Sequence, residues 1–359
     1  MFKAPLLVLL ALIAPVWTLS ADAASFEILP SGSGVQPQLA ASPNGTCHMV
    51  FGRGDAVFYS GSSDGKAFTT PVKVGEVEKL ALGRRRGPRI AATDGVIAIT
   101  AISHPDGMIH SWTSSDAGKT WRAGAAVNGS PASAREGLHA MAGDGKGAVA
   151  VAWLDSRSGK NQLWSRVSRD GGVTWQPETK VYESPDGHIC ECCHPSVAIG
   201  PKGEISAMWR NWLGGARDMW VATSTDGGKT FGEAGKLGTG TWKLNACPMD
   251  GGSMAYLGDG SLAAVFRREL LVIAAKQSDR TESALAPMAA QPVMATRQGG
   301  SPVYVWQQGG TIQLQDGRQH RSLGTGEFPA IVAAPNGASV LVAWQGEGES
   351  IQGELLPPP

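Results

Sequence analysis

The sequence has few charged residues and no excess of either sign. Charged side chains make up 17% of its 359 residues, and 31 basic residues balance 31 acidic ones. A chain without a basic excess offers no electrostatic basis for binding nucleic acid or an anionic membrane surface. We therefore expect no nucleic-acid partner.

Long hydrophobic runs are missing beyond the first two dozen residues. A membrane-spanning helix needs about 18 or more consecutive apolar residues, which no later segment reaches. The early apolar run, residues 6–16, follows Lys3 and precedes an A-x-A cleavage pattern that ends at Ala23. The sequence thus predicts a signal peptide at residues 1–23 and a single mature domain at residues 24–359. It predicts export to a periplasmic or extracellular space, with no membrane span.

Tyrosine and cysteine are scarce, with four and five copies, whereas glycine is abundant, with 48. Glycine relieves the steric cost of tight turns, and here it alternates with many short runs of Val, Ala and Trp. This composition is typical of many short strands joined by turns. The sequence therefore predicts an all-β fold.

An eight-residue pattern, S-x-D-x-G-x-T-W, recurs along the first two thirds of the chain. Full copies occupy residues 114–121, 168–175 and 224–231, and a copy one residue shorter occupies residues 62–68. The Ser and Asp side chains suit hydrogen bonds to backbone N–H groups in a tight turn, and Gly supplies the positive φ. We interpret the boxes as scaffold and predict that Trp121, Trp175 and Phe231 are buried between neighbouring sheets.

A second repeat marks strand-turn-strand units. Seven units begin near Gln36, Gly87, Gly137, His194, Cys247, Gln291 and Phe328. Each of the first six is followed by further strand-forming sequence, and four-stranded units arranged in a ring make a β-propeller. The last unit, residues 328–356, lacks an outer strand that residues 25–29 could supply. We therefore predict a seven-bladed propeller of four-stranded antiparallel blades, closed by the N-terminal strand.

The boxes resemble those of the Asp-box, or BNR-repeat, β-propellers of the sialidase-like superfamily. That resemblance covers nearly the whole mature chain as scaffold, and it makes six blades, the number in sialidases, the alternative count. It also implies hydrolysis of terminal sialic acids by an arginine triad, an Asp acid/base and a Tyr–Glu pair. The Phe/Tyr-Arg-Ile-Pro motif that carries the first arginine is absent, and Gly87-Pro88-Arg89-Ile90 matches it only in part. The resemblance therefore transfers no catalytic residue.

The loops between second and third strands and the crossings between blades should emerge on one face, which we call the crossing face. Its polar residues form the candidate site for a small-molecule, glycan or protein ligand: Arg86, Arg135, Glu136, Asp155, Arg157, Arg210 and Arg267. Paired N–H groups of arginine suit carboxylates and sulfate. The alternative interpretation is a set of ordinary solvated loops.

Four of the five cysteines fall in two consecutive blade crossings and should cluster on the crossing face. They are Cys190, Cys192, Cys193 and Cys247, whereas Cys47 follows a turn of the opposite face. An exported protein favours disulfides, with Cys247 bridged to the 190–193 segment. The alternative is a thiolate metal site with His194 or His188, suited to copper or zinc.

Three functional hypotheses follow from the sequence, of which the last is a copper-handling protein of the cell envelope. The first is a binding scaffold for a ligand, partner or metal on the Arg/Cys face. The second is an exo-sialidase-like glycoside hydrolase with a divergent active site. Whether the chain is an enzyme stays undecided at this stage.

Overall fold

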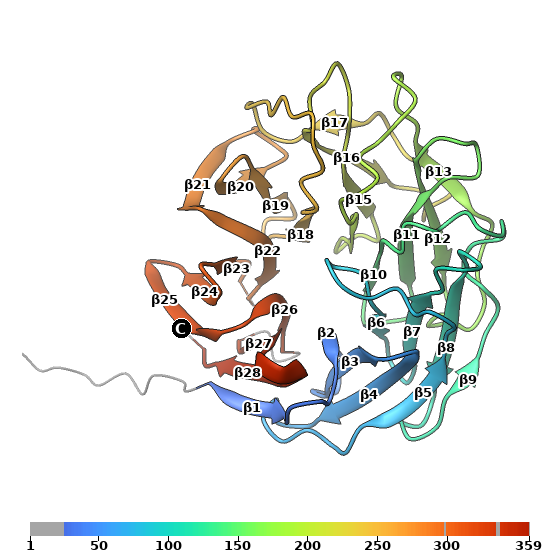
Figure 1. Ribbon diagram of the computed structural model, residues 1–359, viewed down its shortest axis with the longest axis vertical. Coiled ribbons are helices and arrows are strands. Elements are labelled where there is room, and N and C mark those ends of the chain that lie inside the picture. The colour runs from blue at the N-terminus through green and yellow to red at the C-terminus, as the bar shows by residue number, and fades with distance from the viewer. Residues whose placement is uncertain (1–24, 298, 335–337, 359) are drawn as a thin grey trace, which may run out of the picture.

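The computed structural model describes residues 25–297, 299–334 and 338–358, and it shows seven four-stranded antiparallel sheets arranged in a ring (Figure 1). The predicted signal peptide lies outside the described residues. The predicted seven-bladed count is confirmed, and the six-bladed alternative is wrong. Among the described residues, no helix is long and apolar enough to cross a membrane.

The blades follow one another along the chain, and each runs from the centre of the ring to its rim. Blade 1 consists of β2 (Val35–Ala41), β3 (Cys47–Arg53), β4 (Ala56–Ser62) and β5 (Val72–Glu76). Blade 2 consists of β6 (Arg89–Ala92), β7 (Ile97–Ile102), β8 (Ile109–Ser114) and β9 (Arg122–Ala123). Blade 3 consists of β10 (His139–Gly143), β11 (Val149–Asp155), β12 (Gln162–Ser168) and β13 (Thr179–Tyr182).

The remaining blades repeat this order. Blade 4 consists of β14 (Ser196–Ile199), β15 (Ile205–Arg210), β16 (Met219–Ser224) and β17 (Gly235–Lys236). Blade 5 consists of β18 (Gly252–Tyr256), β19 (Leu262–Arg268), β20 (Leu271–Lys276) and β21 (Glu282–Pro287). Blade 6 consists of β22 (Ala289–Thr296), β23 (Pro302–Gln308), β24 (Thr311–Asp316) and β25 (Gln319–Thr325).

Blade 7 is assembled from both ends of the chain. Its inner strands are β26 (Glu327–Ala333), β27 (Val340–Gln345) and β28 (Ile351–Leu356), with the short helix η1 (Glu347–Glu349) before β28. The outer strand is β1 (Phe26–Leu29), which pairs antiparallel with β28 through Phe26 opposite Gly353. The predicted N-terminal closure is therefore confirmed, and it covers an edge that would otherwise be free to pair with another chain.

The Asp-box turns join third to fourth strands, as predicted, and their hydrogen bonds explain the motif. In blade 3, Ser168 Oγ donates to Asp170 Oδ1 (2.7 Å), and the Thr174 hydroxyl donates to Asp170 Oδ2 (2.6 Å). Gly172, at φ 94°, donates its N–H to Ser168 Oγ (2.8 Å). The corresponding bonds to Asp116 from Thr120 and Ser114 lower the pKa of that exposed carboxyl to about 2.

The aromatic residues of the boxes are less buried than the sequence suggested. Trp121, Trp175 and Phe231 are half-buried, and each packs at the junction with the preceding blade. Full burial belongs to a different repeated position, near the end of the second strand, where the side chain packs between its own sheet and the preceding blade. Tryptophan fills that position in four blades, with 0–1% of each residue exposed: Trp153, Trp209, Trp306 and Trp344.

Because Trp175 is half-buried, Trp175→Ala should lower the free energy of unfolding by about 2 kcal/mol, less than the 3–5 kcal/mol of a fully buried tryptophan. Urea denaturation of both proteins measures the difference. Val173→Ala in the same hairpin is the control, because Val173 is 52% exposed and should be neutral. An unchanged midpoint for Trp175→Ala would show that the box aromatic adds nothing to packing.

Candidate functional site

Three cysteine thiols meet in the crossing from blade 3 to blade 4. The segment is fixed at the N-terminal end of the motif: Ile189 forms a β-bridge with Asn211, and the Cys190 N–H donates to the Arg210 carbonyl (2.9 Å). Both partners belong to the β15–β16 side of blade 4. The backbone of the segment is thus part of the sheet edge, which holds the cysteines in place.

The three sulfur atoms lie close together. Cys190 Sγ is 3.5 Å from Cys192 Sγ and 3.4 Å from Cys193 Sγ, and the latter two are 4.0 Å apart. All three residues are buried, with 1%, 7% and 1% exposed. Among the described residues they form the one group of three or more metal-ligating side chains whose ligand atoms converge. We call it the three-thiol cluster.

Two guanidinium groups face this cluster. Arg217, in the β15–β16 loop, donates from Nη1 to Cys190 Sγ (2.9 Å) and is itself held by the Leu244 carbonyl (3.1 Å). Hydrogen bonding to Cys192 and Cys193, and then the charges of Arg217 and Arg210, hold the pKa of the Cys190 thiol well below its usual range. The site therefore favours a thiolate at Cys190.

The other two thiols respond in the opposite direction. Hydrogen bonding to Cys190 raises the pKa of Cys192, and burial raises the pKa of Cys193. In the absence of a cation, the three-thiol cluster therefore favours one thiolate and two thiols. A cation among the sulfurs would reverse the balance, because a metal ion deprotonates the thiols that coordinate it.

The structure places the other predicted ligands nearby but outside the cluster. Cys247 is exposed, with its Sγ 3.8 Å from Glu191 Oε1, so it touches the same segment without joining the three sulfurs. His194 is half-buried, and its Nδ1 accepts a hydrogen bond from the Gly251 N–H (3.2 Å). Cys47 lies in blade 1 beside Asp64, where burial raises its pKa to about 11.

The predicted arginine and carboxylate set divides into three separate groups. Arg157 forms ion pairs with Asp155 and Glu178, each at 2.7 Å. Arg86, in the crossing before blade 2, donates to the carbonyl of Glu136 in the crossing before blade 3 (2.6 Å), and burial raises the pKa of Glu136. Neighbouring Arg135 is exposed.

The third group lies between blades 4 and 5. Arg210 is 1% exposed, and its guanidinium donates to the backbone carbonyls of Asp250, Arg217 and Arg267 at 2.8–3.2 Å. Arg267 donates to the Pro248 carbonyl (2.7 Å) and pairs with Asp250 at 3.2 Å. These contacts join blade 4 to blade 5, so the two arginines serve the scaffold.

The central channel contains two arginines, Arg85 and Arg89, that the sequence did not single out as a site. A narrow part of the channel, about 180 Å³ in volume, is lined by Arg85, Arg89 and His194. Arg85 spans the channel mouth and donates to the Pro329 and Gln291 carbonyls, both at 2.6 Å. Burial lowers the pKa of Arg85 to about 10. This arginine closes the ring of first strands at the crossing-face end.

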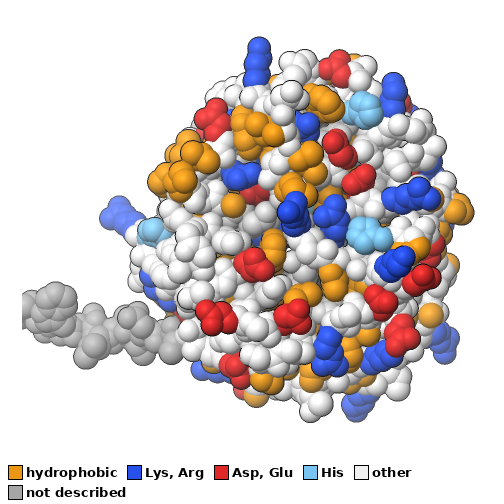
Figure 2. Space-filling model, in the orientation of Figure 1, with side chains coloured by type: hydrophobic (Ala, Val, Ile, Leu, Met, Phe, Trp, Pro, Cys, Tyr) orange, Lys and Arg blue, Asp and Glu red, His pale blue; other side chains and the backbone are white. Residues whose placement is uncertain are grey.

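A family model for BNR repeat-like domains matches residues 89–338 of the chain, which covers six of the seven blades in whole or in part. The chain belongs to the BNR repeat-like family. A comparison with curated protein sequences found no match. The face shown in Figure 2 carries basic and acidic side chains interspersed, as expected from the equal numbers of the two in the sequence.

Solved structures similar to this BNR repeat-like propeller include enzymes and a protein captured with a peptide. An α-L-arabinanase of Penicillium chrysogenum has a TM-score of 0.54 at 14% identity, over 93% of this chain and 98% of that one. An intramolecular trans-sialidase of Ruminococcus gnavus has a TM-score of 0.56 at 11% identity, over 92% and 96%. YCF48 bound to D1 peptide has a TM-score of 0.55 at 13% identity, over 92% and 96%. At these identities the likeness is one of fold.

Proposed function

We propose that this BNR repeat-like propeller binds a soft metal ion, with Cu(I) preferred, at the three-thiol cluster, and that it is a binding protein without glycoside hydrolase activity. The spacing of the sulfurs carries the proposal. Three thiolates about 2.3 Å from one ion lie about 3.8 Å apart in tetrahedral geometry and about 4.0 Å apart in a flat trigonal one. The sulfur separations of 3.4, 3.5 and 4.0 Å are close to both values.

Charge and ligand number support Cu(I) over zinc. Structural zinc takes four ligands, and the described residues bring three ligand atoms together here. Thiolates select soft ions such as Cu(I). A Cu(I) ion held by three thiolates carries net negative charge, which Arg217 and Arg210 beside the cluster would offset. Cys247 is the candidate for an additional, transient ligand, since its loop contacts Glu191.

The engagement of the arginines argues against the hydrolase alternative. A sialidase needs several guanidinium groups free to hold the sugar carboxylate. Of the arginines in the predicted ligand site, Arg210 is bound to three backbone carbonyls and Arg267 to one carbonyl and Asp250. A similar fold, YCF48, is known bound to a peptide, so binding without catalysis is in keeping with the architecture.

The proposed location is the periplasm or the cell exterior, reached through the signal peptide predicted at residues 1–23. That setting oxidises free thiols, and the three cysteines would form a disulfide there unless a metal occupied them. The proposal therefore includes metal loading before or soon after export.

The test is a Cu(I) titration of the full mature chain, purified without air, against a chromogenic Cu(I) chelator. We expect one equivalent to move from the chelator to the protein, with Zn²⁺ bound much more weakly. No transfer of Cu(I), or a disulfide among Cys190, Cys192 and Cys193 in the anaerobically isolated protein, would overturn the proposal. Turnover of a fluorogenic sialoside by the same preparation would instead support the glycoside hydrolase hypothesis.

A further inference from the structure

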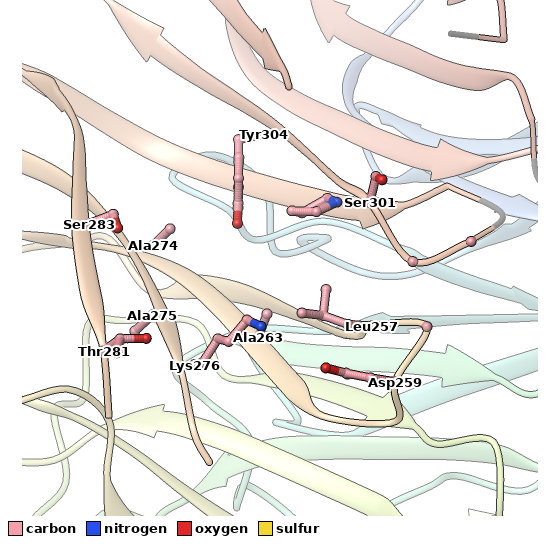
Figure 3. Close-up of a pocket in the computed structure, with 14 residues that line it drawn as sticks. Leu257, Asp259, Ala263, Ala274, Ala275, Lys276, Thr281, Ser283, Ser301 and Tyr304 are labelled. Carbon is pink, nitrogen blue, oxygen red and sulfur yellow. The ribbon is translucent and has the colours of Figure 1, made fainter. Parts of the chain in front are cut away.

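The junction between blades 5 and 6 contains an open pocket of about 440 Å³ on the face that carries the Asp-box turns. Blade 5 contributes Ala263 from β19 and Ala275 and Lys276 from β20, and blade 6 contributes Ser301 and Tyr304. Figure 3 shows these side chains around one space, with the hydroxyl end of Tyr304 pointing into it. The volume is within the range of about 300–1,000 Å³ that is usual for ligand pockets.

At three other junctions, the Asp-box hairpin of the following blade occupies the corresponding place. A Cβ on Gly172 of the blade 3 box would meet Ala98 of blade 2 at 2.7 Å, and one on Gly228 of the blade 4 box would meet Val167 of blade 3 at 2.5 Å. The blade 2 box approaches blade 1 in the same way, since a Cβ on Gly118 would meet the Tyr59 ring at 2.1 Å. The aromatic residue of each box packs at the same junction.

Strand register identifies the equivalent positions in blade 5. In blade 2, the first and second strands open on the pair Ala92–Ile97, so Ala98 is the second residue of β7, and it lies opposite Thr113 of β8. In blade 5, the opening pair is Tyr256–Leu262, and the second residue of β19 is Ala263, opposite Lys276 of β20. Ala263 and Lys276, which line the pocket, therefore correspond to the positions on which a box hairpin rests.

Blade 6 has no Asp-box hairpin that could occupy this place. In blade 3, residues 169–178 separate β12 from β13 and hold most of the box, whereas residues 317–318 alone separate β24 from β25 in blade 6. The tight turn of blade 6 cannot reach across to blade 5. The pocket is thus the space that an Asp-box hairpin and its aromatic side chain fill at other junctions, and blade 6 lacks both.

The other two junctions without a box are closed by other side chains. Between blades 4 and 5, Tyr256 reaches across, and its hydroxyl lies 2.7 Å from Ser206 Oγ. Between blades 6 and 7, buried Arg297 pairs with Asp316 of its own blade (2.6 Å) and donates to the Ala338 carbonyl of blade 7. The residue of blade 6 that corresponds to Tyr256 is Thr296, at the opening pair with Pro302, and it is too short to fill the space.

We propose that this pocket binds an aromatic side chain carried on a tight turn of a partner polypeptide, in the place that Trp175 and its equivalents occupy at the other junctions. Its floor of alanines and Leu257 suits an apolar ring, and the Tyr304 ring offers an edge or face for aromatic packing. Lys276 at the rim can lie over the bound ring as a cation–π partner. This inference is independent of the metal site on the opposite face.

The probe is a cyclic hairpin peptide with the chain's own box sequence, residues 168–175, tested by isothermal titration against the full mature protein. We expect one peptide per chain and at least a 10-fold loss of affinity when alanine replaces its tryptophan. In the protein variant Ser301→Trp, a tryptophan fills the pocket from an exposed rim position. This variant should bind the peptide at least 10-fold more weakly than the wild type. Lys202→Trp in the corresponding turn of blade 4 is the matched control and should bind like the wild type.

Free indole distinguishes a side chain from a small aromatic ligand. We expect indole to bind in the same pocket more weakly than the peptide and to be displaced by it. Indole that binds as tightly as the peptide would contradict a polypeptide partner. Absence of peptide binding, or binding that Ser301→Trp leaves unchanged, would overturn the inference.

Discussion

Cys190→Ser should weaken Cu(I) binding by at least about 100-fold relative to the wild type. Substitution of groups that merely orient a metal ligand costs about 10–100-fold in affinity, and loss of a ligand should exceed that range. Cys190 is the sulfur nearest to both other thiols and the one that Arg217 contacts. Its removal leaves two thiols and deprives the Arg217 guanidinium of its sulfur acceptor. Competition with a Cu(I) chelator, under the same anaerobic conditions as for the wild type, measures the change.

Two cysteines outside the cluster provide matched controls. Cys47→Ser changes a buried thiol in blade 1, and Cys247→Ser changes the exposed thiol next to Glu191. Both variants should keep one equivalent of Cu(I), with affinity within about 10-fold of the wild type, because neither sulfur belongs to the three-thiol group. An equal loss in Cys190→Ser and Cys247→Ser would instead support the four-cysteine site expected from the sequence.

Arg210→Met should lower the free energy of unfolding by about 3–5 kcal/mol, the cost of breaking a buried charged network by removing one partner. The Arg210 guanidinium satisfies three backbone carbonyls from the β15–β16 side of blade 4 and from blade 5. Methionine keeps much of the side-chain volume but donates no hydrogen bond, so the carbonyls of Asp250, Arg217 and Arg267 stay buried and lose this donor.

Urea denaturation of the purified variants gives the size of the effect. Arg122→Met, on the exposed strand β9, is the control and should change stability by no more than about 0.5 kcal/mol. If Arg210→Met unfolds at the wild-type midpoint, Arg210 is not a structural link between the blades. An arginine free of that role would again be a candidate for binding a ligand carboxylate.

The fold could be predicted from the sequence because its determinants are local and repeated. Each Asp-box sets its own hairpin through bonds within a few residues, such as those of Asp170 with Ser168 and Thr174. Seven strand-turn-strand units gave the blade count even though the later blades have lost the box. The N-terminal strand at residues 26–29 belonged to no unit, and the seventh unit lacked an outer strand. The two were therefore expected to pair, as β1 and β28 do.

The site was harder to predict because it depends on where side chains point across loops. The three thiols converge because the 190–193 segment is short, which the sequence shows, whereas Cys247 comes from a second crossing whose side-chain direction is not encoded by any repeat. Arg217 lies 27 positions after Cys190, and no motif links the two. Likewise, nothing in the sequence reveals that the Arg210 guanidinium binds backbone carbonyls.

The most direct test of the metal site is X-ray absorption at the copper edge of the full mature protein loaded with one equivalent of Cu(I). The account predicts three sulfur scatterers at about 2.2–2.3 Å and no nitrogen or oxygen neighbour. In Cys190→Ser the sulfur number should fall to two or the metal should be absent. A wild-type spectrum dominated by nitrogen or oxygen ligands, or one with fewer than three sulfurs, would contradict the three-thiol site.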